Sequence, residues 1–216
     1  LLMGIESLAL DAEGEYEIVA ESLGGINVVL SPNSKTIINL FDIETETAKD
    51  EITGRERLVL NIENKVEDVT QSLLTMARGS TRSDEVNELT KQIIAEAVAE
   101  EYAALGITND PSSLYEATSN FNRGDKLYRG KKKMPTIGSW YKRIQAKAQD
   151  NENDDYRYHY SYLLKVMKQY IREYNGQMAY FDGQSTFELL EGAPFINLDI
   201  SQLEEKFARP LAQQIL

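Results

Sequence analysis

The sequence predicts an α/β protein in which a block of helices is inserted into a core of parallel strands. Short apolar runs typical of strands lie near both ends of the chain, at residues 6–10, 26–30 and 193–199. Between about residues 63 and 175, apolar side chains instead recur every three or four positions, as in amphipathic helices. The first part of the core, the helical insertion and the return to the core are expected at residues 1–55, 56–176 and 177–216.

The first thirty residues predict a strand, a helix and a second strand. The strand at 6–10 is followed by a loop and by a helix at 15–23, which Gly24 and Gly25 end. The β-branched run at 26–30 is the second strand. Two strands joined by one helix normally run parallel, so we expect a parallel pair here.

Four helices are expected in the insertion, at residues 66–76, 83–105, 140–148 and 156–174. Ser83 is the expected cap of the second helix, because acidic residues follow it in the favourable first turn. Gly106 is expected to end that helix, and Gly176 to end the long fourth helix.

The chain returns to the sheet pattern before its end. Ala193 to Asp199 predicts a buried strand, and Ser201 to Glu204 predicts a capping box that opens a last helix. Apolar spacing by fours continues to the final residue, and the first residues resemble the end of an apolar element. Because a few parallel strands cannot be covered on both faces alone, we expect a fragment cut at both ends. The alternative is a natural terminus that docks in the core.

The composition limits the possible functions. The 216 residues carry a formal net charge of −12, which disfavours a nucleic-acid coat or a polybasic membrane anchor, since both need a positive field. The absence of cysteine excludes disulfides and thiolate metal sites, and the single histidine excludes a histidine-cluster metal site. No apolar run approaches the roughly 18 residues that span a bilayer, and no signal peptide is present, so a cytoplasmic setting is expected.

One acidic segment follows directly after the first predicted strand. Asp11, Glu13 and Glu15 lie at the carboxyl end of that strand, the edge at which open α/β folds bind ligands. Three carboxylates at this edge could hold a Mg²⁺-bound water or polarise a nucleophilic water. Composition alone favours the simpler interpretation, in which these residues only interact with the dipole of the helix that follows.

Two other motifs carry less specific signals. No phosphate-binding loop of the form G-x-x-x-x-G-K-[ST] is present, and the near match at 124–132 lacks both the spacing and the hydroxyl. The one basic cluster could contact nucleic acid or an acidic partner, or be a solvated loop; it comprises Arg129, Lys131, Lys132 and Lys133. The tyrosines at 156–162 could stack bases, but their helical spacing favours helix packing.

Several segments, in this order, resemble the large ATPases of conjugation and type IV secretion systems, the VirB/TraC/TraE class. They include Leu-Asp-Ala-Glu-Gly-Glu-Tyr, similar to the family's D-x-E-G-E-Y, and Ile-Asn-Leu-Phe-Asp-Ile, where the family usually has Pro in place of Leu40. The segments lie at residues 10–16, 38–43, 134–137, 181–183, 195–201 and 209–212. The resemblance covers essentially the whole chain and rests on the ordered set rather than on any single segment.

The resemblance implies a partial RecA-like P-loop NTPase core of the HerA/FtsK-like type with a large helical insertion. The family's motors form hexamers, associate with the inner face of the cell membrane through other channel components, and energise DNA transfer or secretion. In the family, the phosphate loop precedes the Asp11 strand and the Walker B strand follows the strand at 195–199, so this chain would hold neither. ATP and Mg²⁺ would act in the parent protein, and this chain alone is expected to bind no cofactor and to be inactive. Asp11, Glu13 and Glu15 match the family's acidic motif near the nucleotide.

Two further hypotheses remain open from the sequence. A hexameric DNA translocase or a conjugative coupling protein shares the same core, and would use the basic cluster to bind nucleic acid. A non-enzymatic module would instead bind a protein partner through the helical block, and an exposed apolar patch on that block would favour it.

Overall fold

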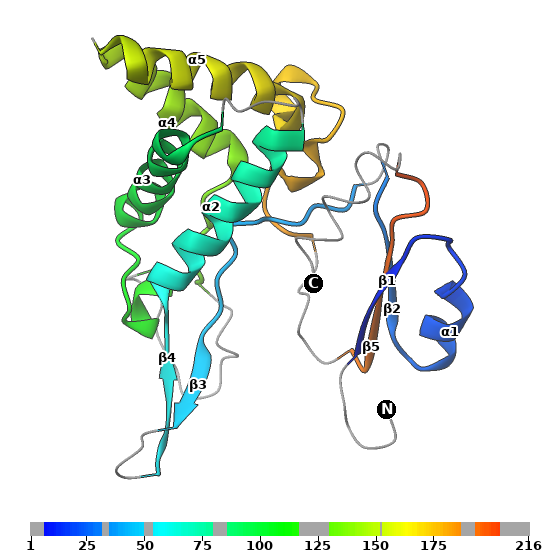
Figure 1. Ribbon diagram of the computed structural model, residues 1–216. Coiled ribbons are helices and arrows are strands. Elements are labelled where there is room, and N and C mark those ends of the chain that lie inside the picture. The colour runs from blue at the N-terminus through cyan, green and yellow to red at the C-terminus, as the bar shows by residue number, and fades with distance from the viewer. Residues whose placement is uncertain are drawn as a thin grey trace.

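The computed structural model describes residues 7–31, 35–49, 54–79, 86–116, 130–151, 153–186 and 193–203. Figure 1 shows a block of helices and, beside it, a small sheet that carries one short helix. Residues near both ends of the chain form this sheet, so the helices are inserted between its strands. The α/β class with parallel strands and inserted helices, expected from the sequence, is confirmed.

Three parallel strands form the sheet in the order β1-β5-β2. β1 spans Ser7–Asp11, β2 spans Ile26–Val29 and β5 spans Phe195–Asp199. The prediction that β1 and β2 pair with each other is wrong, because β5 lies between them and is hydrogen-bonded to both. All residues of β5 after Phe195 are buried, because β5 is the central strand and has a neighbouring strand along each of its two edges.

The two faces of the sheet differ in character. One face carries the register-matched apolar residues Leu10, Leu198 and Val28. Because side chains alternate along a strand, Asp11 and Asn197 lie on the opposite face. The carboxylate of Asp11 bonds to the loop that leads into helix α1 (Glu17–Ser22), so α1 covers this polar face, with Ala20 fully buried.

The helical block contains α2 (Ile62–Gly79), α3 (Glu88–Ala104), α4 (Ile137–Asp150) and α5 (Asp154–Met167). All of the expected helices are present, but α3 begins later than predicted. Asn87 caps it, and its side chain accepts a hydrogen bond from the backbone N–H of Thr90 at 3.1 Å. Ser83, the predicted cap, lies outside the described residues. Gly106 follows the end of α3 with a φ of +65°, as expected for a terminating glycine.

Helix α5 is shorter than predicted. It ends at Met167, and the chain continues as short 3₁₀ helices at Lys168–Tyr170 and Arg172–Tyr174. The backbone then turns back so tightly that a Cβ on Gly176 would lie 2.2 Å from the carbonyl oxygen of Gln169. This return of the chain, rather than Gly176 alone, ends the helix early.

Tyrosine side chains join the helices. The hydroxyl of Tyr162 donates to the carbonyl of Ala77 at 3.1 Å, and that of Tyr170 donates to the carbonyl of Met76 at 3.3 Å. Both carbonyls belong to the last turn of α2, so these tyrosines tie α5 and the 3₁₀ turn after it to the end of α2. The helix-packing interpretation of these tyrosines is therefore confirmed for Tyr162, which is buried.

A buried carboxylate joins α3 to α4. Glu101 accepts hydrogen bonds from Nε of Arg143 at 2.5 Å and from the hydroxyl of Ser139 at 2.6 Å. One turn along, Lys147 pairs with Glu100 at 2.6 Å. Because charge-assisted bonds of this kind are the stronger ones in proteins, they fix the packing of the two helices.

An antiparallel hairpin, β3 (Glu46–Lys49) and β4 (Glu56–Val59), precedes α2. It could not be predicted from the sequence, because half of its strand residues are charged and neither of its faces is apolar. Figure 1 shows it extending away from the helices. The remaining short helices are 3₁₀ turns at Pro111–Leu114 and Ala179–Phe181.

Some predictions fall on residues that are not described. The last helix, expected from Ser201 onward, lies almost wholly beyond Leu203, and Arg129 also lies outside the described residues. The division at residues 55 and 176 remains a prediction. Within the described part of the chain, no helix has the length and apolarity needed to cross a membrane.

Candidate functional site

The carboxyl ends of the three parallel strands meet at one edge of the sheet. Asp11 of β1 lies opposite Asp199 of β5 in the register, and Val29 of β2 lies on the other side of Asp199. Asp11 is 2% exposed and Asp199 is 8% exposed. Two buried carboxylates therefore stand side by side at the edge where open α/β sheets bind ligands.

Asp11 organises the loop that follows it. Its Oδ1 accepts the backbone N–H of Glu13 at 3.1 Å and of Gly14 at 2.8 Å. Its Oδ2 accepts the N–H of Tyr16 at 2.9 Å and the side-chain amide of Asn197 at 3.2 Å. Each oxygen thus accepts two hydrogen bonds, which is the full capacity of a carboxylate. The geometry gives Asp11 a positioning role, holding the loop in place.

The same contacts shift the titration of Asp11. Burial acts to raise the pKa of this carboxyl, but the hydrogen bonds from the backbone of Tyr16 and from Asn197 act in the opposite direction. The hydrogen bonds prevail, and the pKa of Asp11 lies below its ordinary value. Asp11 is therefore ionised at neutral pH.

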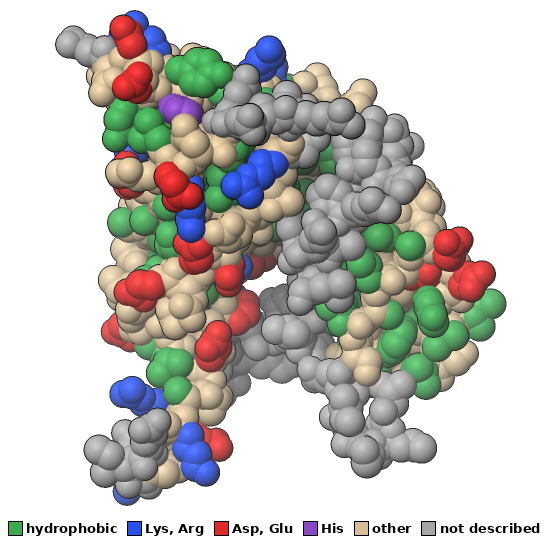
Figure 2. All heavy atoms as spheres, in the orientation of Figure 1, with side chains coloured by type: hydrophobic (Ala, Val, Ile, Leu, Met, Phe, Trp, Pro, Cys, Tyr) green, Lys and Arg blue, Asp and Glu red, His purple; other side chains and the backbone are tan. Residues whose placement is uncertain are grey.

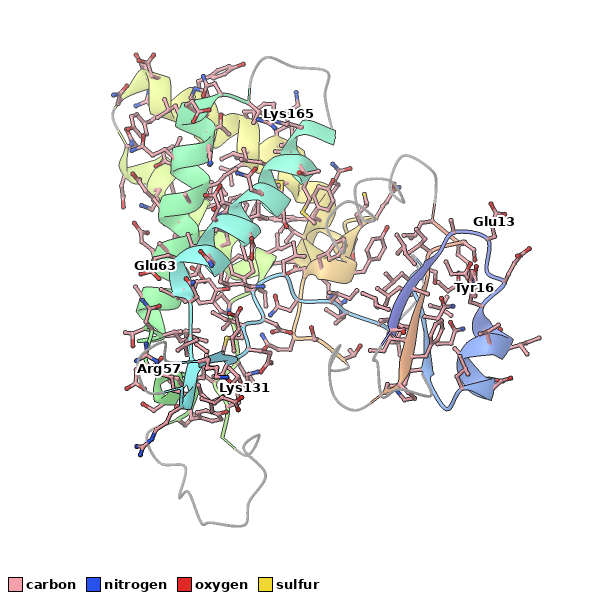
Figure 3. The ribbon with its side chains drawn as sticks, turned by 60° about the horizontal axis from the view of Figure 1, so that its bottom comes forward. Glu13, Tyr16, Arg57, Glu63, Lys131 and Lys165 are labelled. Carbon is pink, nitrogen blue, oxygen red and sulfur yellow. The ribbon has the colours of Figure 1, made fainter. Side chains whose placement is uncertain are left out.

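Glu13 and Glu15 extend from this loop into solvent. Both are exposed, and neither side chain makes a hydrogen bond or ion pair with a described residue. Figure 3 shows Glu13 and Tyr16 at the outer margin of the molecule, far from the helical block. Of the three predicted acidic residues, these two have carboxylates available to a ligand.

Residues far from the loop in the sequence support it. Asn197 is fully buried in β5 and bridges the sheet, donating to Asp11 and, at 2.8 Å, to the side-chain oxygen of Asn27. Gly14 has a φ of +74°, and a Cβ added to it would lie 3.0 Å from the hydroxyl of Ser201. The backbone N–H of Ser201 in turn bonds to Asp199 at 2.9 Å. These contacts could not be predicted, because Asn197 and Ser201 lie far from Asp11 along the chain.

Two side chains of the predicted basic cluster make contacts within the chain. Lys131 pairs with Glu44, and Lys132 donates to the carbonyl of Leu105 at the end of α3 at 2.7 Å. Lys133 is exposed, and Arg129 is not described. Two of the four basic side chains thus serve contacts within the chain.

Three of the segments that carry the family resemblance meet where the helical block joins the sheet. We call residues 37–43, 134–138 and 180–186 the joint. Asn39 donates to the carbonyl of Pro135 at 2.9 Å, and its backbone N–H bonds to the hydroxyl of Ser185 at 2.8 Å. Residues more than ninety positions apart are therefore bonded directly to one another.

Two further side chains close the joint. Gln184 makes two hydrogen bonds with the backbone of Met134, accepting its N–H at 3.1 Å and donating to its carbonyl at 2.7 Å. Asp182 is buried and accepts the backbone N–H of Gly138, in the first turn of α4, at 2.7 Å. Its second oxygen accepts the N–H of Arg172 at 2.8 Å. The Phe-Asp-Gly and Met-Pro-Thr segments thus fix the start of α4.

Charged side chains lie in the joint and beside it. Burial raises the pKa of Asp42, although a hydrogen bond from Ser185 and the charge of Lys131 act in the opposite direction. Burial likewise lowers the pKa of Lys65 in α2, against the charges of Asp68 and Asp42. Asp42 and Lys65 are thus both partly removed from water, and their opposite charges interact at the base of the helical block.

An open pocket of about 470 Å³ lies between the β3–β4 hairpin and the start of α2. Arg57, Glu63 and Asn109 are among its lining residues. Asn109 closes the start of α2, accepting the N–H of Ile62 at 3.0 Å and donating to Glu63. None of the predicted site residues lines this pocket, and Figure 3 shows Arg57 and Glu63 far from Glu13. Among the described residues, no group of three potential metal ligands is present.

Comparison with known proteins finds similarity among solved structures. No family model matches the chain, and no curated protein matches its sequence. The solved structure of VirB4 of Thermoanaerobacter pseudethanolicus is similar to it, with a TM-score of 0.62 and 20% sequence identity. The similarity covers 99% of this chain and 68% of that chain. At this identity the match establishes the fold, and it agrees with the expected partial RecA-like core.

Proposed function

We propose that this chain is the central part of an ATPase motor that energises a type IV secretion or conjugative DNA-transfer channel. Support comes from the fold shared with VirB4 along almost the whole chain. The segments that resemble the conjugation ATPases also have definite structural roles, because they build the acidic loop and the joint. That coincidence is the observation that carries the proposal.

The carboxyl edge of the sheet is the proposed nucleotide side of the motor. Asp11 holds the acidic loop there, and Glu13 and Glu15 present free carboxylates. Carboxylate oxygens are ligands that Mg²⁺ prefers, often through bound water. In the complete motor Mg²⁺ would neutralise the phosphate charge of ATP, and Glu13 or Glu15 would orient a water at the metal or the phosphate. The phosphate-binding loop would come from outside this chain.

The wider assembly is part of the same proposal. A motor of this type would work as a hexamer with other channel components as partners, at the inner face of the cell membrane. Membrane association would then be peripheral and would depend on those partners.

Turnover of MgATP tests the proposal. We expect none from this chain and clear turnover from a version extended along its gene in both directions. Glu15→Gln in the extended protein should abolish turnover, whereas Glu21→Gln, an equal change of charge on α1, should leave it intact. Absence of turnover in both proteins would reject the motor and favour a non-enzymatic interaction module.

DNA binding separates the motor of a secretion channel from a DNA translocase or coupling protein. The engagement of Lys131 and Lys132 within the chain speaks against a nucleic-acid surface at this place. We expect no binding of duplex DNA at 50 mM salt. Tight binding that falls steeply between 50 and 200 mM salt would favour the translocase.

A further inference from the structure

Helix α1 turns an apolar face to solvent. Ile18 is 74% exposed, the largest exposed fraction among the described large hydrophobic residues. Val19 is 42% exposed and Leu23 is 38% exposed, whereas Ala20 points to the sheet and is fully buried. A surface helix normally does the reverse, placing polar residues outward and large apolar residues inward.

The exposed apolar residues form one patch. Tyr16, Val19 and Leu23 follow one another at three- and four-residue spacing, so they share one side of α1, and Ile18 lies beside them, next to Val19 in the sequence. Tyr16, 48% exposed, adjoins them at the start of α1. Figure 2 shows hydrophobic side chains gathered over this part of the molecule, with acidic side chains at their margin. A contiguous patch of this kind marks an interaction site, whereas single exposed residues do not.

The described residues that build the sheet and α1, at 7–31 and 193–203, include acidic side chains but no lysine or arginine. Glu17 and Glu21 lie one turn apart beside it, and Glu13 and Glu15 precede it, all exposed. The first 34 residues of the sequence contain six carboxylates and no lysine or arginine. The patch therefore lies in a negative field that no neighbouring residue of this segment neutralises.

This charge decides between occupants. A second copy of the chain would bring two acidic margins together, and like charges at close range oppose binding. Anionic lipid and nucleic acid are repelled for the same reason. We propose that α1 is a docking surface for a partner segment that forms an amphipathic helix, apolar on one face and lined by lysine or arginine. This inference goes beyond the proposed ATPase function and does not depend on it.

Binding of a model peptide tests the proposal. The probe is a fluorescent 14-residue peptide, two repeats of Leu-Lys-Lys-Leu-Leu-Lys-Leu, and the readout is anisotropy with the full chain. We expect saturable micromolar binding that weakens as salt increases. An otherwise identical peptide with glutamate in place of lysine should bind at least tenfold more weakly.

Matched variants distinguish docking on α1 from general attraction to an acidic protein. Ile18→Ser with Val19→Ser should weaken binding at least tenfold, while Tyr158→Ser, at a residue 52% exposed on α5, should not. Glu17→Gln with Glu21→Gln should weaken binding at least threefold. The same change of charge on α3, Glu88→Gln with Glu96→Gln, should have little effect.

Three outcomes would overturn the proposal. Peptide binding that is insensitive to the Ile18 and Val19 changes would show attraction to net charge only. Self-association of the chain that Ile18→Ser abolishes would assign the patch to a second copy. Absence of binding at millimolar peptide would reject a basic amphipathic helix as the occupant of the patch. None of these outcomes depends on ATP turnover.

Discussion

At the scale of single residues, the carboxyl edge of the sheet is built around one carboxylate. Asp11 accepts hydrogen bonds from three backbone N–H groups of its own loop and from Asn197 of the neighbouring strand. The sequence predicted the acidic loop and its place after a strand. It could not separate the roles of the three acids, because the role of Asp11 depends on a residue 186 positions away.

Replacing Asp11 by asparagine should destabilise the fold by about 2 kcal/mol at pH 7, because hydrogen bonds to a charged acceptor contribute more than neutral ones. The pKa of Asp11 is lowered in the fold, so its stabilisation is fully present above the ordinary value of 3.8 and is lost as the pH falls through the folded value. Urea unfolding of the wild type and Asp11→Asn should therefore converge below pH 3.8. Glu13→Gln, an exposed control, should change neither the free energy of unfolding nor its dependence on pH. If Asp11→Asn lowered the free energy of unfolding equally at all pH values, the role given to the ionised carboxylate would be wrong.

Gly14 and Gly24 provide a matched pair of substitutions. Both have positive φ, +74° and +69°, so alanine carries a backbone cost of about 1 kcal/mol at either position. At Gly14 the new Cβ also meets the hydroxyl of Ser201, whereas at Gly24 it meets nothing within 4 Å. Thermal unfolding should show Gly14→Ala to be the more destabilising change. Adding Ser201→Gly should remove the difference, and equal effects of the two alanine variants would refute the contact.

At the scale of elements, the joint is built from three of the segments that resemble the conjugation ATPases. Each segment could be recognised as a motif in the sequence, but nothing in the sequence indicated that the three segments contact one another. The structure brings them together through side chains that bond to backbone groups, such as Asn39 to Pro135 and Gln184 to Met134. Hydrophobic periodicity carries no information on such contacts, so the helices could be predicted and the joint could not.

Asp182 should be the most sensitive residue of the joint. Asp182→Ala would leave the N–H groups of Gly138 and Arg172 without their acceptor in a buried place, at a cost of about 2–4 kcal/mol. Hydrogen exchange should show faster exchange in the first turn of α4 before any change in α2. Gln145→Ala, which removes a bond to Tyr174 on the surface, serves as the control. Uniformly faster exchange would mean that Asp182 contributes only global stability.

The tyrosine contacts at the end of α2 can be removed without altering the packing. Tyr162→Phe and Tyr170→Phe each delete one hydroxyl that bonds to an α2 carbonyl, and each should cost about 1 kcal/mol of unfolding free energy. Tyr16→Phe, at an exposed residue, should be neutral. Denaturant titration of the three variants tests this, and neutrality of the two buried variants would show that these hydrogen bonds do not stabilise the fold.

At the scale of the whole molecule, the sheet is assembled from distant parts of the chain. Strand β5 enters between β1 and β2 after more than 160 residues of intervening chain. The strands themselves were predictable from apolar runs, but the order was not, since local patterns do not reveal which strand takes the centre. The hairpin β3–β4 was missed because neither of its faces is apolar. The resemblance, not the periodicity, supplied the RecA-like assignment that agrees with the VirB4 match.

In the complete motor, we propose, the acidic loop faces the metal of the bound nucleotide. Replacing Mg²⁺ by Fe²⁺ in the extended protein, with ATP, ascorbate and peroxide, cleaves the backbone beside the metal. Mass spectrometry should find ATP-dependent cleavage within residues 11–15, and Glu15→Gln should reduce it. Cleavage confined to the helical block, in a protein that turns over MgATP, would contradict the account.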